Sequence, residues 1–170
     1  MENTVTLIRK QYTDFVINYP YGENGRTVSY VFQGTKGNKN TERPIPKEVF
    51  NWLVQETTTI RDGHLIVKEE EIQNDEDVAY AIETIENADK MSESILSFNE
   101  VKDILSKGNH LVLKKELNKL TDNKSEYLAI NIRKNFIQLA QEIGVDSIAK
   151  RKIICEWADL DEDMLDVIFE

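Results

Sequence analysis

The sequence predicts an α+β protein, with a small N-terminal antiparallel β module that contains one short helix, residues 1–70, and an all-helical bundle, residues 71–170. Two observations predict this division. In the N-terminal part, apolar and polar residues alternate, which is the period of a half-buried strand. From about residue 75 onward, apolar residues recur every three or four positions, as in an amphipathic helix. The polar, acidic stretch 68–74 is therefore the expected boundary between the two parts.

The N-terminal module is expected to contain three strands before its helix, over residues 5–10, 14–19 and 27–33. Apolar side chains alternate along the second and third of these strands, so each has one buried face. Between them lies the dipeptide Asn24-Gly25. Because Asn and Gly both tolerate positive φ, this dipeptide predicts a β-hairpin.

A short helix is expected after Pro46, since proline suits the first helical turn, where its missing N–H costs nothing. Its apolar face is expected to consist of Val49, Phe50, Trp52 and Leu53. Residues 64–67 are then expected to return as a strand. We interpret His64 as a strand-edge histidine, because no Cys, His or carboxylate cluster lies near it in the sequence to form a metal site or a catalytic base.

The helical half is expected to follow a linker over residues 69–74. Asn74 can cap a helix over 75–89, and the acidic residues after it suit the positive end of the helix dipole. The apolar residues of this segment repeat at three and four, which leaves a strongly acidic outer face.

Ser97 and Glu100 stand at the spacing of a capping box, and Gly108 is expected to end the helix that they begin. The longest helix is expected over residues 125–143, where a broad apolar stripe indicates a central helix packed on several sides. Further helices are expected up to Leu120, from Asp146 or Ser147, and from Asp161.

Charge is distributed unevenly along the chain. Thirty-one acidic residues against 21 basic ones give a net charge of −10, which disfavours a general attraction to nucleic-acid phosphates or anionic lipid. Four consecutive blocks, 1–67, 68–103, 104–154 and 155–170, carry net charges of +1, −9, +5 and −7. Such alternation suits electrostatic matching within the fold or between copies of the protein, and it also suits solvated helix faces.

No set of residues predicts catalysis, so we expect the protein not to be an enzyme and to bind no cofactor or metal. The loop 34–40 lacks the Gly-Lys-Ser/Thr order of a phosphate-binding loop. The acidic tail has carboxylates at calcium-loop spacing, but Met164 stands where that loop needs a sharply turning glycine. Cys155, the only cysteine, is expected to be a small buried side chain on a helix.

Charged loop and helix surfaces are the expected contact sites for a partner. The residues expected to make such contacts are Lys36, Lys39, Lys114, Lys115, Lys150, Arg151, Glu162 and Asp163. Segments 147–158 and 161–169 have the lengths of a helix-turn-helix, but the second carries carboxylates that phosphates repel. We therefore expect no specific nucleic acid and no membrane among the partners.

The opening strand, the hairpin and the run IPKEVFNWL, closed by GHLIV, resemble segments of small virion proteins of tailed bacteriophages. The resemblance covers residues 1–67. It implies a non-enzymatic structural or assembly protein of the particle, associated with the capsid, its decoration or the neck and head–tail connector. The implied location is the virion, after assembly in the cytoplasm of the bacterial host, and the implied partners are other virion proteins or further copies of the chain. No catalytic residue is implied.

Two other hypotheses remain open at this point. The acidic surface suits a cytoplasmic adaptor or regulatory module that binds a basic protein, in the manner of a nucleic-acid mimic. The many carboxylates also leave room for an enzyme that uses buried carboxylates or a metal, although nothing in the sequence brings two of them into one pocket.

Overall fold

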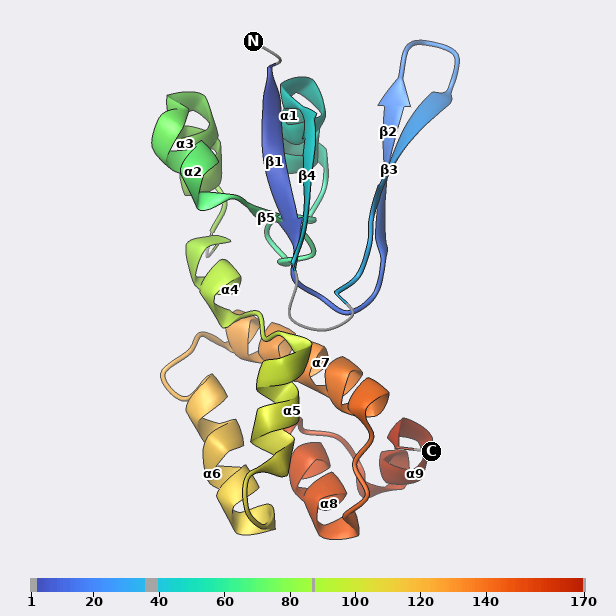
Figure 1. Cartoon of the computed structure of the whole chain (residues 1–170), viewed down its shortest axis with the longest axis vertical. Helices are drawn as coiled ribbons and strands as arrows, with labels where there is room; N and C mark the ends of the chain where they lie inside the picture. Colours follow the sequence, from blue (N-terminus) through green and yellow to red (C-terminus); the bar gives the residue numbers. More distant parts are fainter. Residues whose placement is uncertain (1–2, 36–39, 87, 170) are drawn as a thin grey trace. The chain divides into compact units, whose positions relative to one another are not determined.

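The computed structural model describes residues 3–35, 40–86 and 88–169. It confirms the predicted α+β fold, in which antiparallel strands and a short helix are followed by an all-helical region (Figure 1). Internal contacts divide the chain into two compact units, Met1–Glu93 and Ser94–Glu170. The expected boundary at 68–74 lies inside the first unit, because the helices that follow it pack on the β module.

The described part of the first unit contains the strands β1 (Thr4–Arg9), β2 (Phe15–Tyr21), β3 (Arg26–Phe32), β4 (Thr41–Pro46) and β5 (Ile66–Val67). β1 pairs antiparallel with β4 on one side and with β5 on the other. β2 and β3 form the predicted antiparallel hairpin. Its turn contains Gly22 and Gly25, with φ of 73° and 66°, values that side chains with a Cβ rarely adopt.

β4 was not predicted, because Pro44 and Pro46 lack the N–H that a ladder strand donates. The strand lies at the edge of its sheet, where proline is tolerated. The predicted short helix follows directly as α1 (Lys47–Glu56). Within the predicted apolar face, Trp52 is half-buried and meets the Tyr19 ring edge-on at 5.5 Å between ring centroids.

The core of the first unit joins the two sheets to α1. Its fully buried large side chains include Leu7, Phe32, Ile45, Phe50 and Leu65. Full burial of such a side chain stabilises the fold by about 1.5–3 kcal/mol relative to leaving it exposed. Each sheet alone exposes one apolar face, so the shared core is what holds the sheets and α1 in one unit.

The described part of this unit also contains the short helices α2 (Glu69–Asn74) and α3 (Glu76–Glu83), and α4 (Ala88–Ser94) follows at its end. The expected linker is therefore helical. The cap of α3 is Asp75 and not Asn74, since the Asp75 carboxylate accepts hydrogen bonds from two backbone N–H groups of the first turn. The prediction of one helix over 75–89 is wrong beyond Glu83. The backbone tightens there, where the N–H of Ile85 bonds to a carbonyl three residues back.

The second unit contains α5 (Phe98–Ser106), α6 (His110–Thr121), α7 (Glu126–Ile143), α8 (Ile148–Trp157), the 3₁₀ turn η1 (Glu162–Met164) and α9 (Leu165–Ile168). The predicted capping box is confirmed, because Ser97 and Glu100 each bond the other's backbone N–H through their side chains. Asp161 was expected to cap the last helix, but its side chain forms no capping hydrogen bond and the chain enters η1 instead.

α7 is the central helix of this unit, as predicted. Its buried residues are Leu128, Ala129, Ile132, Asn135, Phe136, Leu139 and Ala140. The Phe136 ring meets Trp157 of α8 edge-on, with 5.4 Å between the ring centroids, a geometry that aromatic pairs favour. In the part of the chain that the structure describes, no helix has both the length and the apolar character needed to cross a membrane.

Candidate protein-binding site

The first unit contains a cavity of about 660 Å³, within the range of about 300–1,000 Å³ that is common for ligand sites. Its main apolar lining is Ile60, Leu65, Ile66, Val67, Ile72, Ile82 and Ile85. Four carboxylates also line it, from Glu69, Glu83, Glu86 and Asp89. We call this feature the acidic-rimmed cavity. It lies where β5 and the loop before it meet α2, α3 and α4.

The apolar floor is fixed by the short strand β5. Ile66 and Val67 pair with Ile8 and Leu7 of β1, so the sheet fixes the backbone from which their side chains project. The preceding loop is held by the guanidinium of Arg9, whose Nη1 donates to the carbonyl of His64 at 2.7 Å. The backbone of the floor is therefore held in place by the sheet and by Arg9.

The wall formed by α2 and α3 is tied to the β module by polar contacts. The backbone N–H of Thr6 donates to the Glu71 carboxylate at 3.0 Å. The Lys47 ammonium lies 2.8 Å from the Asp75 carboxylate and 3.0 Å from that of Asp77. The hydrogen bond between Lys47 and Asp75 raises the pKa of the lysine and lowers the pKa of the carboxyl group. These ties place the half-buried Ile72 at the cavity.

The mouth of the cavity is negatively charged. Glu83, Glu86 and Asp89 are exposed, and none of them forms an ion pair with a described residue. An apolar surface beside carboxylates of this kind can bury apolar side chains of a partner and favour a partner with basic groups around them.

A buried arginine, whose role the sequence did not predict, holds the loop that contributes to the cavity. Arg9 is only 2% exposed, and it donates to the carbonyl of Thr13 at 2.9 Å and to its hydroxyl at 3.1 Å. Its guanidinium lies 5.2 Å from the centroid of the Phe15 ring, which stacks on His64 at 5.0 Å between centroids. Burial lowers the pKa of Arg9 to about 10. Burial and then the charge of Arg9 also lower the pKa of His64, so this histidine is neutral at pH 7 and serves as an aromatic surface.

Two of the residues expected to contact a partner join helices within the second unit. The Lys150 ammonium donates to the carbonyl of Leu105 at 2.6 Å, at the end of α5 where helix carbonyls lack partners. Nε of Arg151 donates to the carbonyl of Val145, and its guanidinium lies 5.8 Å from the centroid of the Phe169 ring. Both side chains hold helix ends together.

The other expected contact residues lie on the surface where they are described. Lys114 pairs with Glu156 at 3.4 Å, and Lys115 is exposed on α6. Glu162 and Asp163 are exposed in η1. The structure brings none of these four predicted residues to the acidic-rimmed cavity. Lys36 and Lys39 lie outside the described residues.

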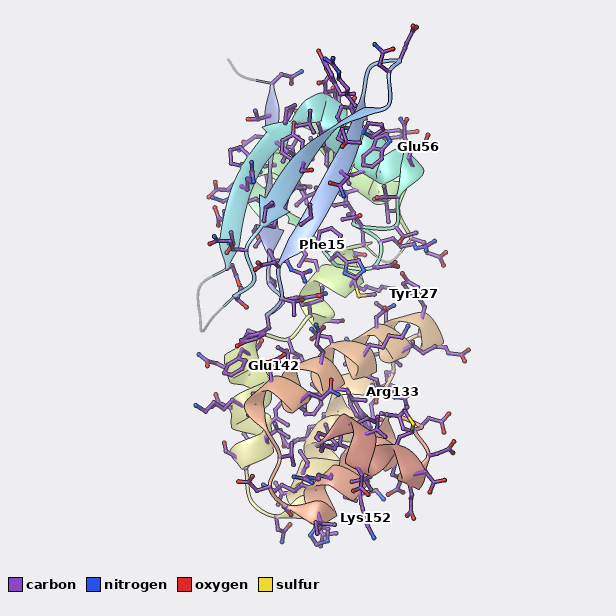
Figure 2. All side chains as sticks on the ribbon, turned by 90° about the vertical axis from the view of Figure 1, so that its right-hand side faces the viewer. Phe15, Glu56, Tyr127, Arg133, Glu142 and Lys152 are labelled. Carbon is purple, nitrogen blue, oxygen red and sulfur yellow. The ribbon has the colours of Figure 1, made fainter. Side chains whose placement is uncertain are left out.

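A second hollow, of about 580 Å³, lies in the second unit around Trp157 and Arg133 of α7. Arg133 is labelled in Figure 2. The Nε of Arg133 has no hydrogen-bond partner among the described residues, and its guanidinium lies 5.9 Å from the centroid of the tryptophan's ring. Lys124 and Glu126 are both part of the lining. Because the lining mixes charges of both signs, this hollow favours no class of ligand, and the acidic-rimmed cavity is the better-defined site.

Comparison with known proteins identifies the family of the first unit. Residues 3–87 match the family model described as the YonA N-terminal domain. No curated protein and no solved structure matches the chain. The YonA domain is phage-related, so the match indicates a phage-associated protein. The match covers half of the 170 residues and includes twelve of the fifteen described residues that line the acidic-rimmed cavity. The chain therefore belongs to the family of the YonA N-terminal domain.

Proposed function

We propose that this chain is a non-enzymatic structural or assembly protein of a tailed-phage particle, associated with the capsid, its decoration or the neck. It acts through protein–protein contacts, and the acidic-rimmed cavity is its principal contact site. The observation that carries the proposal is the cavity itself: an apolar floor with exposed carboxylates at its mouth, in the unit that the phage-related family model matches.

The chemistry of the lining supports binding rather than catalysis. The described lining consists of apolar residues, a glycine, a serine and four carboxylates, with no His, Cys, Lys or Arg, so it lacks the basic side chains that most often activate a nucleophile. Apolar area removed from water stabilises a complex by about 25 cal/mol per Å² before the cost of association. The carboxylates add selectivity for a partner with basic groups.

The same negative mouth favours a second candidate function, the cytoplasmic adaptor that binds a basic protein. The two functions differ in where the protein ends up. A virion protein stays in the particle, whereas an adaptor is left behind in the lysate with its partner.

Mass spectrometry of purified particles, from host cells that carry the gene, tests the proposal. We expect the chain in the particle at a fixed ratio to the major capsid protein. The double variant Glu83→Lys/Glu86→Lys should be lost from particles, whereas the matched control Glu48→Lys/Glu56→Lys, with the same change of charge on α1, should be retained. Absence of the wild-type chain from particles, together with salt-sensitive capture of a basic host protein, would establish the adaptor function instead.

A further inference from the structure

The second unit exposes aliphatic side chains next to lysines. On α6, Leu111 is 58% exposed and Val112 is 40% exposed, and Ile148, the first residue of α8, is 67% exposed. Lys115 and Lys152 are exposed on the same two helices. We call these five residues the aliphatic–lysine patch. Large exposed aliphatic side chains that gather in one place mark an interaction surface.

The patch lies at one end of the second unit. The hydrogen bond from Lys150 to the carbonyl of Leu105 fixes the first turn of α8 against the last turn of α5. α6 begins only a few residues after α5 ends. The connection between the two helices passes close to the patch, because a Cβ added at Gly108 would lie 3.0 Å from the Val112 side chain. Figure 1 shows the start of α6 and the start of α8 at the same end of this unit.

The two lysines of the patch can pair with carboxylates of a partner. Neither Lys115 nor Lys152 forms an ion pair with a residue in the described ranges. The first unit, by contrast, holds seventeen acidic residues against ten basic ones, and the exposed carboxylates at the mouth of its cavity form no ion pair with a described residue. The patch and the cavity are therefore complementary in both respects: aliphatic side chains meet an apolar floor, and lysines meet carboxylates.

We propose that the chain associates with itself head to tail, with the aliphatic–lysine patch of one copy seated on the acidic-rimmed cavity of the next. The proposal deepens the proposed function, because it rests on the same cavity and names a second copy as the occupant. The two surfaces are different parts of the chain, so the contact is heterologous. Such a contact repeats until it closes into a ring or extends as a filament.

Sedimentation velocity of the purified full-length chain, over a concentration series, is the first test. We expect association that grows with concentration and weakens at least about fivefold between 0.1 M and 1 M salt, where the screening length falls from about 10 to 3 Å. A chain that remains monomeric over the whole series at low salt overturns the proposal.

A reciprocal charge reversal is the second test. The cavity variant Glu83→Lys/Glu86→Lys and the patch variant Lys115→Glu/Lys152→Glu should each associate with themselves about tenfold more weakly. An equimolar mixture of the two variants should associate again, since every contact between one variant and the other joins opposite charges. Circular dichroism checks that both variants are folded.

Matched variants control for net charge. Glu48→Lys/Glu56→Lys on α1 and Lys124→Glu/Lys134→Glu at α7 make the same charge changes elsewhere and should leave association unchanged. Association that neither reversal weakens, or a mixture that does not recover, overturns the proposal. Self-association of a chain that is absent from particles refutes the proposed function alone, whereas a particle-bound chain that is monomeric in solution refutes this inference alone.

Discussion

Replacing Arg9 by methionine should destabilise the first unit strongly. Methionine keeps most of the aliphatic stem but removes the guanidinium, which donates to the carbonyls of Thr13 and His64 and to the Thr13 hydroxyl. These acceptors then remain without a donor in a buried site, where the arginine was only 2% exposed. The loop that carries His64 also loses the contact that fixes it beneath the acidic-rimmed cavity.

The magnitude follows from two opposing effects. A hydrogen bond to a charged group contributes about 1.5–3 kcal/mol, and an orphaned buried acceptor costs about 1–3 kcal/mol. Against this, the variant no longer removes a charged group from water, a cost that the lowered pKa of Arg9 reflects. We therefore expect the free energy of unfolding of the first unit to fall by about 2–4 kcal/mol.

Urea unfolding can follow each unit by its own tryptophan, since Trp52 lies in the first unit and Trp157 in the second. In a Trp157→Phe background, the fluorescence of Trp52 reports the first unit. With an m value of about 1–2 kcal/mol/M, the midpoint should fall by about 1–4 M. The control Arg61→Met, whose side chain is 49% exposed, should shift it by less than about 0.5 M. An equal shift in both variants would refute the reasoning.

Three further predictions concern single contacts. Ser97→Ala removes the cap of α5 and should lower the free energy of unfolding of the second unit by about 1 kcal/mol. The control Ser106→Ala should change this free energy by less than about 0.5 kcal/mol. Equal effects of the two substitutions would contradict the role of the cap. The Asp75 carboxyl group should titrate in NMR spectra with a pKa below 3.8, and this pKa should return towards 3.8 in Lys47→Met. The carboxylate therefore stabilises the fold above pH 3.8, and this stabilisation is lost as the pH falls through the pKa of the folded state. An unchanged pKa in the variant would count against the pairing of Lys47 with Asp75. Cys155 is 2% exposed, and burial raises the pKa of its thiol. The thiol should therefore react with a disulfide reagent only when the chain unfolds. Rapid labelling of the native chain would contradict this burial.

Local sequence signals predicted most elements of the fold. The hairpin at Asn24-Gly25, the capping box at Ser97 and the central helix over 125–143 each depend on residues close together in the sequence. The errors arose where tertiary contacts decide. β4 contains prolines that only an edge position tolerates, and the acidic stretch 69–74 is helical where contacts such as the Glu71 carboxylate on β1 hold it in place.

The candidate site was predictable only in part. The acidic outer face and apolar stripe of the segment after residue 75 were evident from its periodicity, and they supply one wall of the cavity. The floor comes from the pairing of β5 with β1, a contact between residues about sixty positions apart, which a single sequence does not reveal. Arg9 and Lys150 carry charges that favour the surface, and only the structure shows their hydrogen bonds to distant carbonyls.

Zero-length cross-linking of carboxylates to lysines, in a mixture of isotope-labelled and unlabelled copies, tests most directly whether the acidic-rimmed cavity is the contact surface. Mass spectrometry then distinguishes links between copies from links within one copy. The account predicts intermolecular links from Glu83 or Glu86 to Lys115 or Lys152. Links between copies that involve other carboxylates, such as that of Glu162, and leave the cavity carboxylates unlinked would contradict it.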